Sequence, residues 1–266
     1  MPRHPALVDL QLCAAEAMAD ECQCPNRRAR DAFTLNELLI VVAVIGALAA
    51  LTVPGWNLQK EKSRRVRCRG NLRVLAGSAH MYASDNRAQI YDNTAENGYW
   101  NTQCVTPGAF KSMVYEVIGD DFVDCPGLRP FSVPGAVVAP GDRVGRDGGV
   151  YIGYNYLGGI KRLPAEAGWK SPLTTFDAPD TPLFTDANNY GFEDRPWVVI
   201  PHRPTGPARL GGSTFLWLDW VLTPKSYGGE GGNVVTLDGS VEWKPIDRLN
   251  GDHWIARRDV MSRGYW

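Results

Sequence analysis

The sequence predicts an α+β protein in which a long N-terminal hydrophobic α-helix packs on an antiparallel β-sheet domain with long loops. Residues 38–53 carry no charge, and residues 68–82 repeat apolar side chains at spacings of three and four. From residue 87 onward the chain holds 15 of its 19 prolines and 24 of its 28 glycines, about a fifth of the segment. Because disorder is indicated only above roughly 25–30% of these residues, this part is predicted to be a folded, loop-rich domain.

The apolar part of the predicted helix covers residues 33–53. These 21 residues would extend about 32 Å, which matches a hydrocarbon core of about 30 Å, so the segment is predicted to span a membrane. Glu37 departs from this pattern, since an ionised carboxylate in an apolar region is costly unless it has a partner.

The remaining part of the predicted helix, residues 54–86, is amphipathic. Its stripe can pack on a globular domain and consists of Cys68, Leu72, Leu75, Ala79 and Tyr82. Six of the ten residues from 60 to 69 are basic. They can form a solvated face or contact lipid headgroups, other subunits or nucleic acid. Nucleic acid is disfavoured because no aromatic residues interleave with this run.

Residues 1–32 are interpreted as a leader outside the fold. They mix charges, lack an apolar run and end in a basic cluster, Arg27, Arg28 and Arg30. A secretory signal would place its apolar stretch before the cleavage site, whereas here the apolar stretch follows the junction. On hydropathy alone, an ordinary signal-anchor with a cytosolic tail is the alternative.

The residues at this junction resemble the signature of type IV prepilins and type II secretion pseudopilins. They read Arg-Asp-Ala-Phe-Thr-Leu-Asn-Glu-Leu-Leu, and the apolar run that follows ends at Pro54, which matches the proline that often interrupts this helix. The resemblance implies that a prepilin peptidase cuts between Ala32 and Phe33, removes a cytoplasmic leader and methylates the new amino terminus. Ala32 departs from the family, which nearly always has glycine there.

The resemblance also implies that Phe33, Glu37 and Pro54 act in assembly. The Glu37 carboxylate would pair with the cationic amino terminus at Phe33 of a neighbouring subunit, so that two charges costly in an apolar bundle become tolerable together. The alternative is a glutamate side chain that reaches the lipid headgroups at a helix end.

Residues 60–86 resemble one group of pseudopilin-like proteins in particular. The proteins of this group commonly carry a C-terminal motif in which a histidine is followed, after nine residues, by Asp-Gly. Asp238 and Gly239 match that ending, but Gly228 stands at the histidine position. The resemblance implies a non-enzymatic structural subunit of a type IV pilus-like filament or a type II secretion pseudopilus, with residues 33–53 as the filament core. Its partners would be other copies, other pilins, the peptidase and the inner-membrane assembly platform. It would cross the inner membrane once with a periplasmic C-terminal domain, or lie in an extracellular filament.

Residues 87–266 are predicted to form a globular, β-rich domain. Candidate strands rich in aromatic and β-branched residues cover 150–156, 196–200 and 214–222. A hairpin is predicted between 233–237 and 240–244, joined by Asp238-Gly239 in a type I′ turn.

Three cysteines follow residue 33. Cys104 and Cys125 flank a predicted helix at 109–118 and are the favoured disulfide pair if the domain lies outside the cytosol. Closing that loop would be worth roughly 3 kcal/mol. Cys68 is interpreted as a small core residue, although its pairing with either of the others stays open.

The sequence indicates no enzyme, no metal site and no resident cofactor. Its four histidines have no metal-ligand or triad spacing. Asp219, inside an apolar run, is interpreted as hydrogen-bonded rather than catalytic. Asp186, Asn188 and Asn189, and residues 142–147, could bind calcium, but turn formation is favoured.

An alternative function rests on the nine tryptophans. Aromatic platforms would suit a single-pass, membrane-anchored extracytoplasmic module that binds glycans or mediates adhesion without polymerising. The candidate residues are Trp100, Trp169, Trp197, Trp217, Trp220, Trp243 and Trp254.

Overall fold

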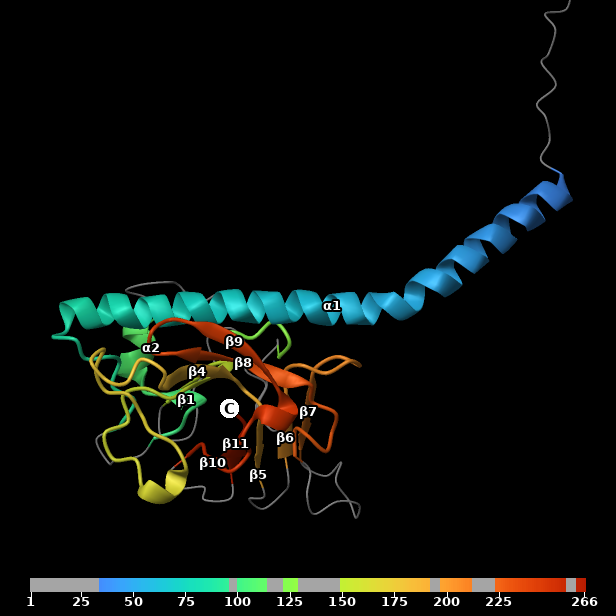
Figure 1. The fold of residues 1–266 in the computed structure, drawn as a ribbon. Helices are drawn as coiled ribbons and strands as arrows, with labels where there is room; N and C mark the ends of the chain where they lie inside the picture. The colour runs from blue at the N-terminus through green and yellow to red at the C-terminus, as the bar shows by residue number, and fades with distance from the viewer. Residues whose placement is uncertain are drawn as a thin grey trace, which may run out of the picture. The chain divides into compact units, whose positions relative to one another are not determined.

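The computed structural model divides the chain into two compact units, Met1–Ala49 and Ala50–Trp266. Helix α1, Leu35–Asp85, has residues in both units (Figure 1). The leader and the junction at Ala32 and Phe33 lie outside the described residues. Within the described part, no helix is both long enough and apolar enough to cross a membrane. The structure describes residues 34–95, 100–113, 122–128, 149–191, 197–211, 223–256 and 262–266.

Helix α1 begins with a capping box. The Glu37 N–H donates to Thr34 Oγ1 (3.3 Å), and Glu37 Oε2 accepts hydrogen bonds from the Thr34 N–H (2.9 Å) and O–H (2.8 Å). This reciprocal bonding satisfies donors that a helix start otherwise leaves unpaired. The Thr-x-x-Glu spacing therefore explains why the helix starts at Leu35.

The second part of α1 buries the predicted amphipathic stripe. Cys68, Leu72, Leu75 and Ala79 are 0% exposed, and Tyr82 packs against the same core. The predicted end of the helix is also confirmed, because α1 stops at Asp85. The Asn86 side-chain amide donates to the Tyr82 carbonyl (2.8 Å), which satisfies one carbonyl of the last turn.

The described residues of the C-terminal domain form three antiparallel sheets (Figure 1). The four-stranded sheet has the order β3-β4-β8-β9, with β3 Tyr154–Tyr156, β4 Pro182–Asp186, β8 Gly231–Thr236 and β9 Val241–Pro245. The five-stranded sheet has the order β10-β11-β5-β6-β7, with β10 His253–Trp254, β11 Arg263–Gly264, β5 Asn189–Gly191, β6 Trp197–Ile200 and β7 Ala208–Gly211. The two-stranded sheet pairs β1 Cys104–Val105 with β2 Val150–Tyr151. The short helices among the described residues are α2 Pro107–Met113, η4 Ala165–Ala167 and η6 Ile246–Arg248.

The second part of α1 runs along the four-stranded sheet (Figure 1). Its stripe shares one core with Tyr154 of β3, Phe184 of β4 and Val235 of β8. A ring nitrogen of His80 lies 2.6 Å from the Leu237 carbonyl, which ties the helix to the end of the β8–β9 hairpin. The predicted α+β arrangement with antiparallel sheets is therefore confirmed.

Several local predictions are confirmed within the described residues. The candidate at 150–156 forms two strands, β2 and β3, and the candidate at 196–200 contains β6. Helix α2 covers the first part of 109–118, whose remainder lies outside the described residues. The candidate at 214–222, with Asp219, also lies outside them.

The hairpin prediction is confirmed for the strands but wrong for the turn. A type I′ turn needs positive φ at both central residues, whereas Gly239 has φ 82° and Asp238 is not among the residues with positive φ. The Thr236 N–H donates to the Ser240 carbonyl (3.0 Å), so the loop is longer than two residues. Asp238 Oδ1 closes it by accepting hydrogen bonds from the Thr236 hydroxyl (2.6 Å) and the Ser240 N–H (2.9 Å).

Candidate functional site

The first part of α1 exposes large apolar side chains all round. Residues 38–42 are five consecutive apolar positions, so their side chains point to every side of the helix. A helix with no polar face requires cover from lipid or from neighbouring protein. The exposed fractions range from 45% to 82% for Leu35, Leu38, Leu39, Ile40, Val41, Val42, Val44 and Ile45.

Glu37 lies at the start of this apolar segment. Its carboxylate is exposed and is held by the two Thr34 hydrogen bonds described above. From the sequence, Glu37 was interpreted as an assembly residue or as a side chain that reaches the lipid headgroups. That interpretation missed this cap, although the Thr-x-x-Glu spacing is its signature. Pro54 lies within α1.

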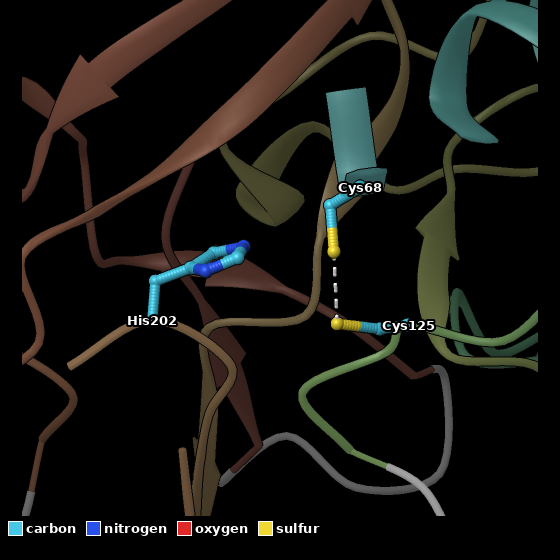
Figure 2. Close-up of side chains that lie close together, drawn as sticks. All are labelled: Cys68, Cys125 and His202. Carbon is cyan, nitrogen blue, oxygen red and sulfur yellow. Dashed lines mark hydrogen bonds between the residues drawn. The ribbon is translucent and has the colours of Figure 1, made fainter. Parts of the chain in front are cut away.

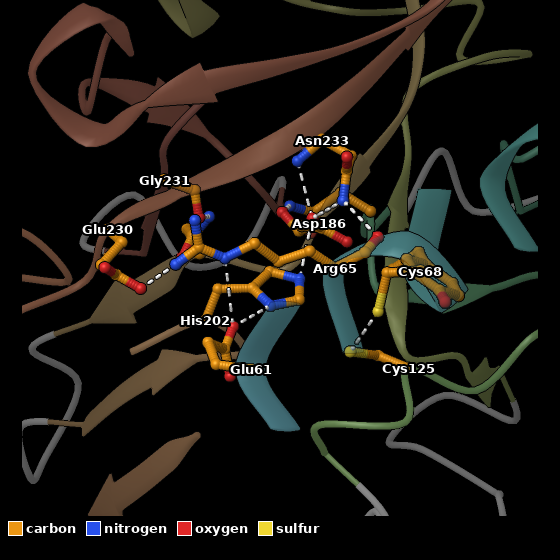
Figure 3. Close-up of polar contacts among 12 residues, drawn as sticks. Glu61, Arg65, Cys68, Cys125, Asp186, His202, Glu230, Gly231 and Asn233 are labelled. Carbon is orange, nitrogen blue, oxygen red and sulfur yellow. Dashed lines mark hydrogen bonds and ion pairs between the residues drawn. The ribbon is translucent and has the colours of Figure 1, made fainter. Parts of the chain in front are cut away.

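A second candidate site is a buried ionic cluster where α1 meets the C-terminal domain (Figure 3). His202 lies between two carboxylates, with Nδ1 2.7 Å from Glu61 Oε1 and Nε2 3.1 Å from Asp186 Oδ2. All three side chains are at most 2% exposed. We refer to Glu61, Arg65, Asp186, His202 and Glu230 as the His202 cluster.

The two carboxylates fix the charge of His202. Burial alone would lower the pKa of the imidazole, but Asp186 and Glu61 outweigh that effect and raise the pKa to about 10. Burial likewise acts to raise the pKa of Glu61, but the hydrogen bond to His202 and the charges of His202 and Arg65 lower it below its usual value. The cluster therefore holds a buried imidazolium whose charge is compensated on both sides.

Arg65 extends the cluster to the rim. Its Nε lies 3.4 Å from Glu61 Oε1, and its guanidinium forms an ion pair with Glu230. The guanidinium also lies over the Trp243 ring, 4.2 Å from the centroid. Arg65 thus covers the partly exposed side of the cluster and stacks on the Trp243 ring.

Asp186 joins the cluster to the sheets. Its Oδ2 accepts hydrogen bonds from the Asn233 N–H (2.6 Å) and side-chain amide (2.8 Å). Asn188 donates to the Gly231 carbonyl (3.1 Å), and Asn189 exchanges hydrogen bonds with Asn155 (2.8 and 3.0 Å). The residues considered for calcium thus hold β-sheet segments together, and residues 142–147 lie outside the described part.

Sequence reasoning missed Glu61 and His202. The apolar stripe, continued toward the amino terminus from Cys68 by three and then four residues, leads to Arg65 and Glu61. That continuation was the available signal for a buried Glu61, but the surrounding basic residues suggested a solvated face. The sequence near His202 gives no local signal of its partners, because Glu61 lies 141 positions away and Asp186 lies 16 positions away.

The cysteines differ from the predicted pairing. Cys125 Sγ lies 3.2 Å from Cys68 Sγ (Figure 2), while Cys104 lies in β1 opposite Tyr151. None of these three cysteines forms a disulfide. The predicted Cys104–Cys125 pair is therefore not formed, and Cys125 lies beside Cys68 of α1 instead.

The candidate tryptophans in the described part serve packing. Trp100 is 1% exposed and meets Trp169 edge to face, and Trp169 donates a hydrogen bond to the Trp254 carbonyl (2.9 Å). Trp197 and Trp243 are half-buried. Trp217 and Trp220 lie outside the described residues. These contacts give no support to an aromatic binding platform among the described candidates.

Comparison with known proteins reveals a partial similarity. Over 63 residues the chain is 36% identical to type II secretion system core protein G of Pseudomonas aeruginosa, covering 24% of this chain and 44% of that protein. Over 54 residues it is 41% identical to the protein of the same name from Klebsiella pneumoniae, covering 20% of this chain and 39% of that protein. The Escherichia coli protein of that name is 37% identical over 54 residues, 20% of this chain and 37% of its own length.

The matched region is less than half the length of these curated relatives. No family model matches the chain, and no solved structure matches it. The resemblance to pseudopilins that the sequence predicted is confirmed over this partial region: there, the chain is similar to type II secretion system core protein G.

Proposed function

We propose that this chain is a non-enzymatic, pilin-like structural subunit that assembles through the first part of α1 into a type II secretion pseudopilus or a type IV pilus-like filament. The observation that carries the proposal is the helix surface between Leu35 and Ile45, which exposes apolar side chains on every side. A helix of this kind is stable at the centre of a bundle of identical helices, where neighbours cover all its faces. The names of the relatives favour the secretion pseudopilus.

The same helix would hold the subunit in the inner membrane before assembly. The uncharged run at 38–53 supports this step. The C-terminal domain would lie on the periplasmic side, as the resemblance of the junction to pseudopilins implies. A prepilin peptidase would remove residues 1–32 and methylate the amino group of Phe33. The partners of the mature subunit would be other copies, other pilins and the assembly platform of the inner membrane.

Glu37 would guide the assembly of neighbouring subunits. In the isolated helix its carboxylate is held by Thr34. In the filament it would accept the charged amino terminus of an adjacent subunit, because each of these charges is costly in an apolar core without the other. The capping box keeps the carboxylate at the helix start, where a neighbouring amino terminus would reach it.

The experiment co-expresses the full chain with a prepilin peptidase and an assembly platform. Mass spectrometry identifies the amino terminus, and shearing separates filaments from membranes. We expect a methylated Phe33 and recovery of the chain in sheared filaments. An intact Met1 together with a chain that stays in the membrane fraction would overturn the proposal.

Two variants separate the role of the charge from that of the cap. Glu37→Gln removes the charge, but glutamine also forms capping boxes. Thr34→Ala removes the capping hydroxyl and retains the charge. We expect Glu37→Gln to abolish filaments and Thr34→Ala to leave them largely intact. Loss of filaments in Thr34→Ala alone would show that Glu37 acts only as a cap.

A further inference from the structure

We propose that Cys68, Cys125 and His202 bind a zinc ion, with Asp186 as the fourth ligand, and that this ion clamps α1 to the C-terminal domain. The proposal is independent of filament assembly. It concerns a second role for part of the His202 cluster and for the two cysteines beside it. The three side chains project toward one another from three different segments (Figure 2).

The donor atoms are already close together and buried. One donor atom from each of the three residues lies within 4.8 Å of the others, and all three residues are buried. The two sulfur atoms are 3.2 Å apart. In a tetrahedral site with Zn–S bonds of about 2.3 Å, the sulfurs would be about 3.8 Å apart, so small side-chain movements suffice to admit the ion.

His202 has the surroundings of a ligand histidine. Its Nδ1 is engaged by Glu61 Oε1 at 2.7 Å, which leaves Nε2 as the nitrogen available to a metal. Nε2 is fully buried and forms no hydrogen bond of good geometry, although Asp186 lies nearby. A carboxylate on the far nitrogen is the arrangement that orients histidine ligands in metal sites and increases their basicity.

Asp186 would supply the fourth donor after a side-chain shift, because the donor atoms that lie within 4.8 Å of one another belong to Cys68, Cys125 and His202. Its Oδ2 lies 3.1 Å from His202 Nε2 and is held by Asn233, whereas its Oδ1 is buried and has no hydrogen-bond partner. A buried carboxylate oxygen without a partner is costly, and coordination to a cation would satisfy it.

The chemistry of the donors favours zinc over calcium. Two sulfurs and an imidazole are soft or borderline ligands, which suit zinc, whereas calcium prefers six to eight oxygens. Binding would release one proton from each thiol and one from the imidazolium as one Zn²⁺ enters. The net charge of the site then falls by one unit, and Arg65 lies beside it to balance that change.

The ion would connect segments that are distant in sequence. Cys68 lies in α1, Cys125 in the segment 122–128, and His202 directly after β6. Cys68 also begins the buried stripe that packs α1 on the four-stranded sheet. A zinc ion here would fix the helix to the domain at one end of their interface.

The test measures metal in the full chain, purified without a polyhistidine tag or a chelator and with its thiols reduced. We expect mass spectrometry to find one zinc per chain. Cobalt in place of zinc should give a thiolate-to-cobalt charge-transfer band and the d–d bands of a tetrahedral ion. Cys125→Ser should lose the metal, whereas Cys104→Ser, the same change at a buried cysteine outside the site, should retain it.

Three results would overturn the proposal. One is a reduced chain with reactive thiols at Cys68 and Cys125 that takes up neither zinc nor cobalt. Another is a Cys68–Cys125 disulfide in the isolated protein that, once reduced, binds no metal. The third is unchanged zinc content in Cys125→Ser. If that variant does not fold, the cobalt spectrum of the unmodified chain still decides, because thiolate ligation is visible in it directly.

Discussion

Glu61 of α1 lies 2.7 Å from His202, a residue 141 positions away, and both side chains are buried. The contact lies at one end of the interface between α1 and the C-terminal domain, and the apolar stripe from Cys68 to Tyr82 extends along that interface. The helix is therefore attached by two different means, a charged contact and a hydrophobic one. The following predictions test each of them on the full chain.

Replacing Glu61 should destabilise the protein strongly. In Glu61→Ala the buried imidazolium of His202 loses one of its two carboxylates, and breaking a buried pair in this way costs about 3–5 kcal/mol. The measurement is the free energy of unfolding in urea. Lys62→Ala, at the next and exposed position, is the control and should change it by less than about 0.5 kcal/mol. Equal stability of the two variants would show that the contact contributes little.

The hydrophobic part of the interface should respond to truncation of its side chains. Leu72 is 0% exposed, and Leu72→Ala should lower the free energy of unfolding by about 2–5 kcal/mol through lost burial and a cavity. Val66 on the same helix is 71% exposed, so Val66→Ala should have a small effect. A small effect of Leu72→Ala in urea denaturation would contradict this view of the core.

The sequence was sufficient to predict those elements whose local pattern and tertiary role agree. The spacing of Leu72, Leu75 and Ala79 identified the buried face of α1, because every apolar side chain on one face of a helix needs cover. The Asp238-Gly239 pair identified the position of the hairpin, because Asp and Gly are the residue types that tight turns between strands favour. The predicted type I′ turn was wrong, because the Asp238 side chain closes a loop of more than two residues.

The candidate site beside α1 could not be predicted in the same way. Glu61 occupies a position that the stripe would reserve for an apolar residue, and its partner His202 comes from a distant loop. Likewise, the approach of Cys125 to Cys68 depends on how the segment 122–128 packs on the helix. Such contacts are set by the tertiary structure, and neither partner carries a local signal of the other.

Two glycine substitutions should have opposite effects. Gly70 lies on the exposed side of α1, and a methyl group added there would meet no atom within 4 Å, so Gly70→Ala should raise the free energy of unfolding by up to about 1 kcal/mol. Gly239 has φ 82°, and Gly239→Ala should lower it by about 1–2 kcal/mol. Both changes reduce the freedom of the unfolded chain equally, so their difference reports the folded state. Thermal or urea unfolding of the pair provides the comparison, and effects of the same sign would be inconsistent with it.

Asp177 should contribute to the stability of the protein in a pH-dependent manner. Its Oδ2 accepts hydrogen bonds from the N–H groups of Thr174 (2.8 Å) and Leu173 (2.7 Å), and these bonds lower the pKa of the carboxyl below its usual value of 3.8. Because the pKa is lower in the folded protein than in the unfolded chain, the stabilisation is complete above about pH 4 and is lost as the pH falls through the folded value. This side chain is exposed, so the effect should be below about 1 kcal/mol.

The measurement for Asp177 is the free energy of unfolding between about pH 6 and pH 2. Asp177→Asn should lower stability at neutral pH and should lose less of it on acidification than the unmodified chain. Asp180→Asn removes the same charge three residues further on, at another exposed position, and serves as the control. If Asp180→Asn flattened the acid dependence as much as Asp177→Asn, general charge repulsion rather than the Thr174 and Leu173 hydrogen bonds would account for it.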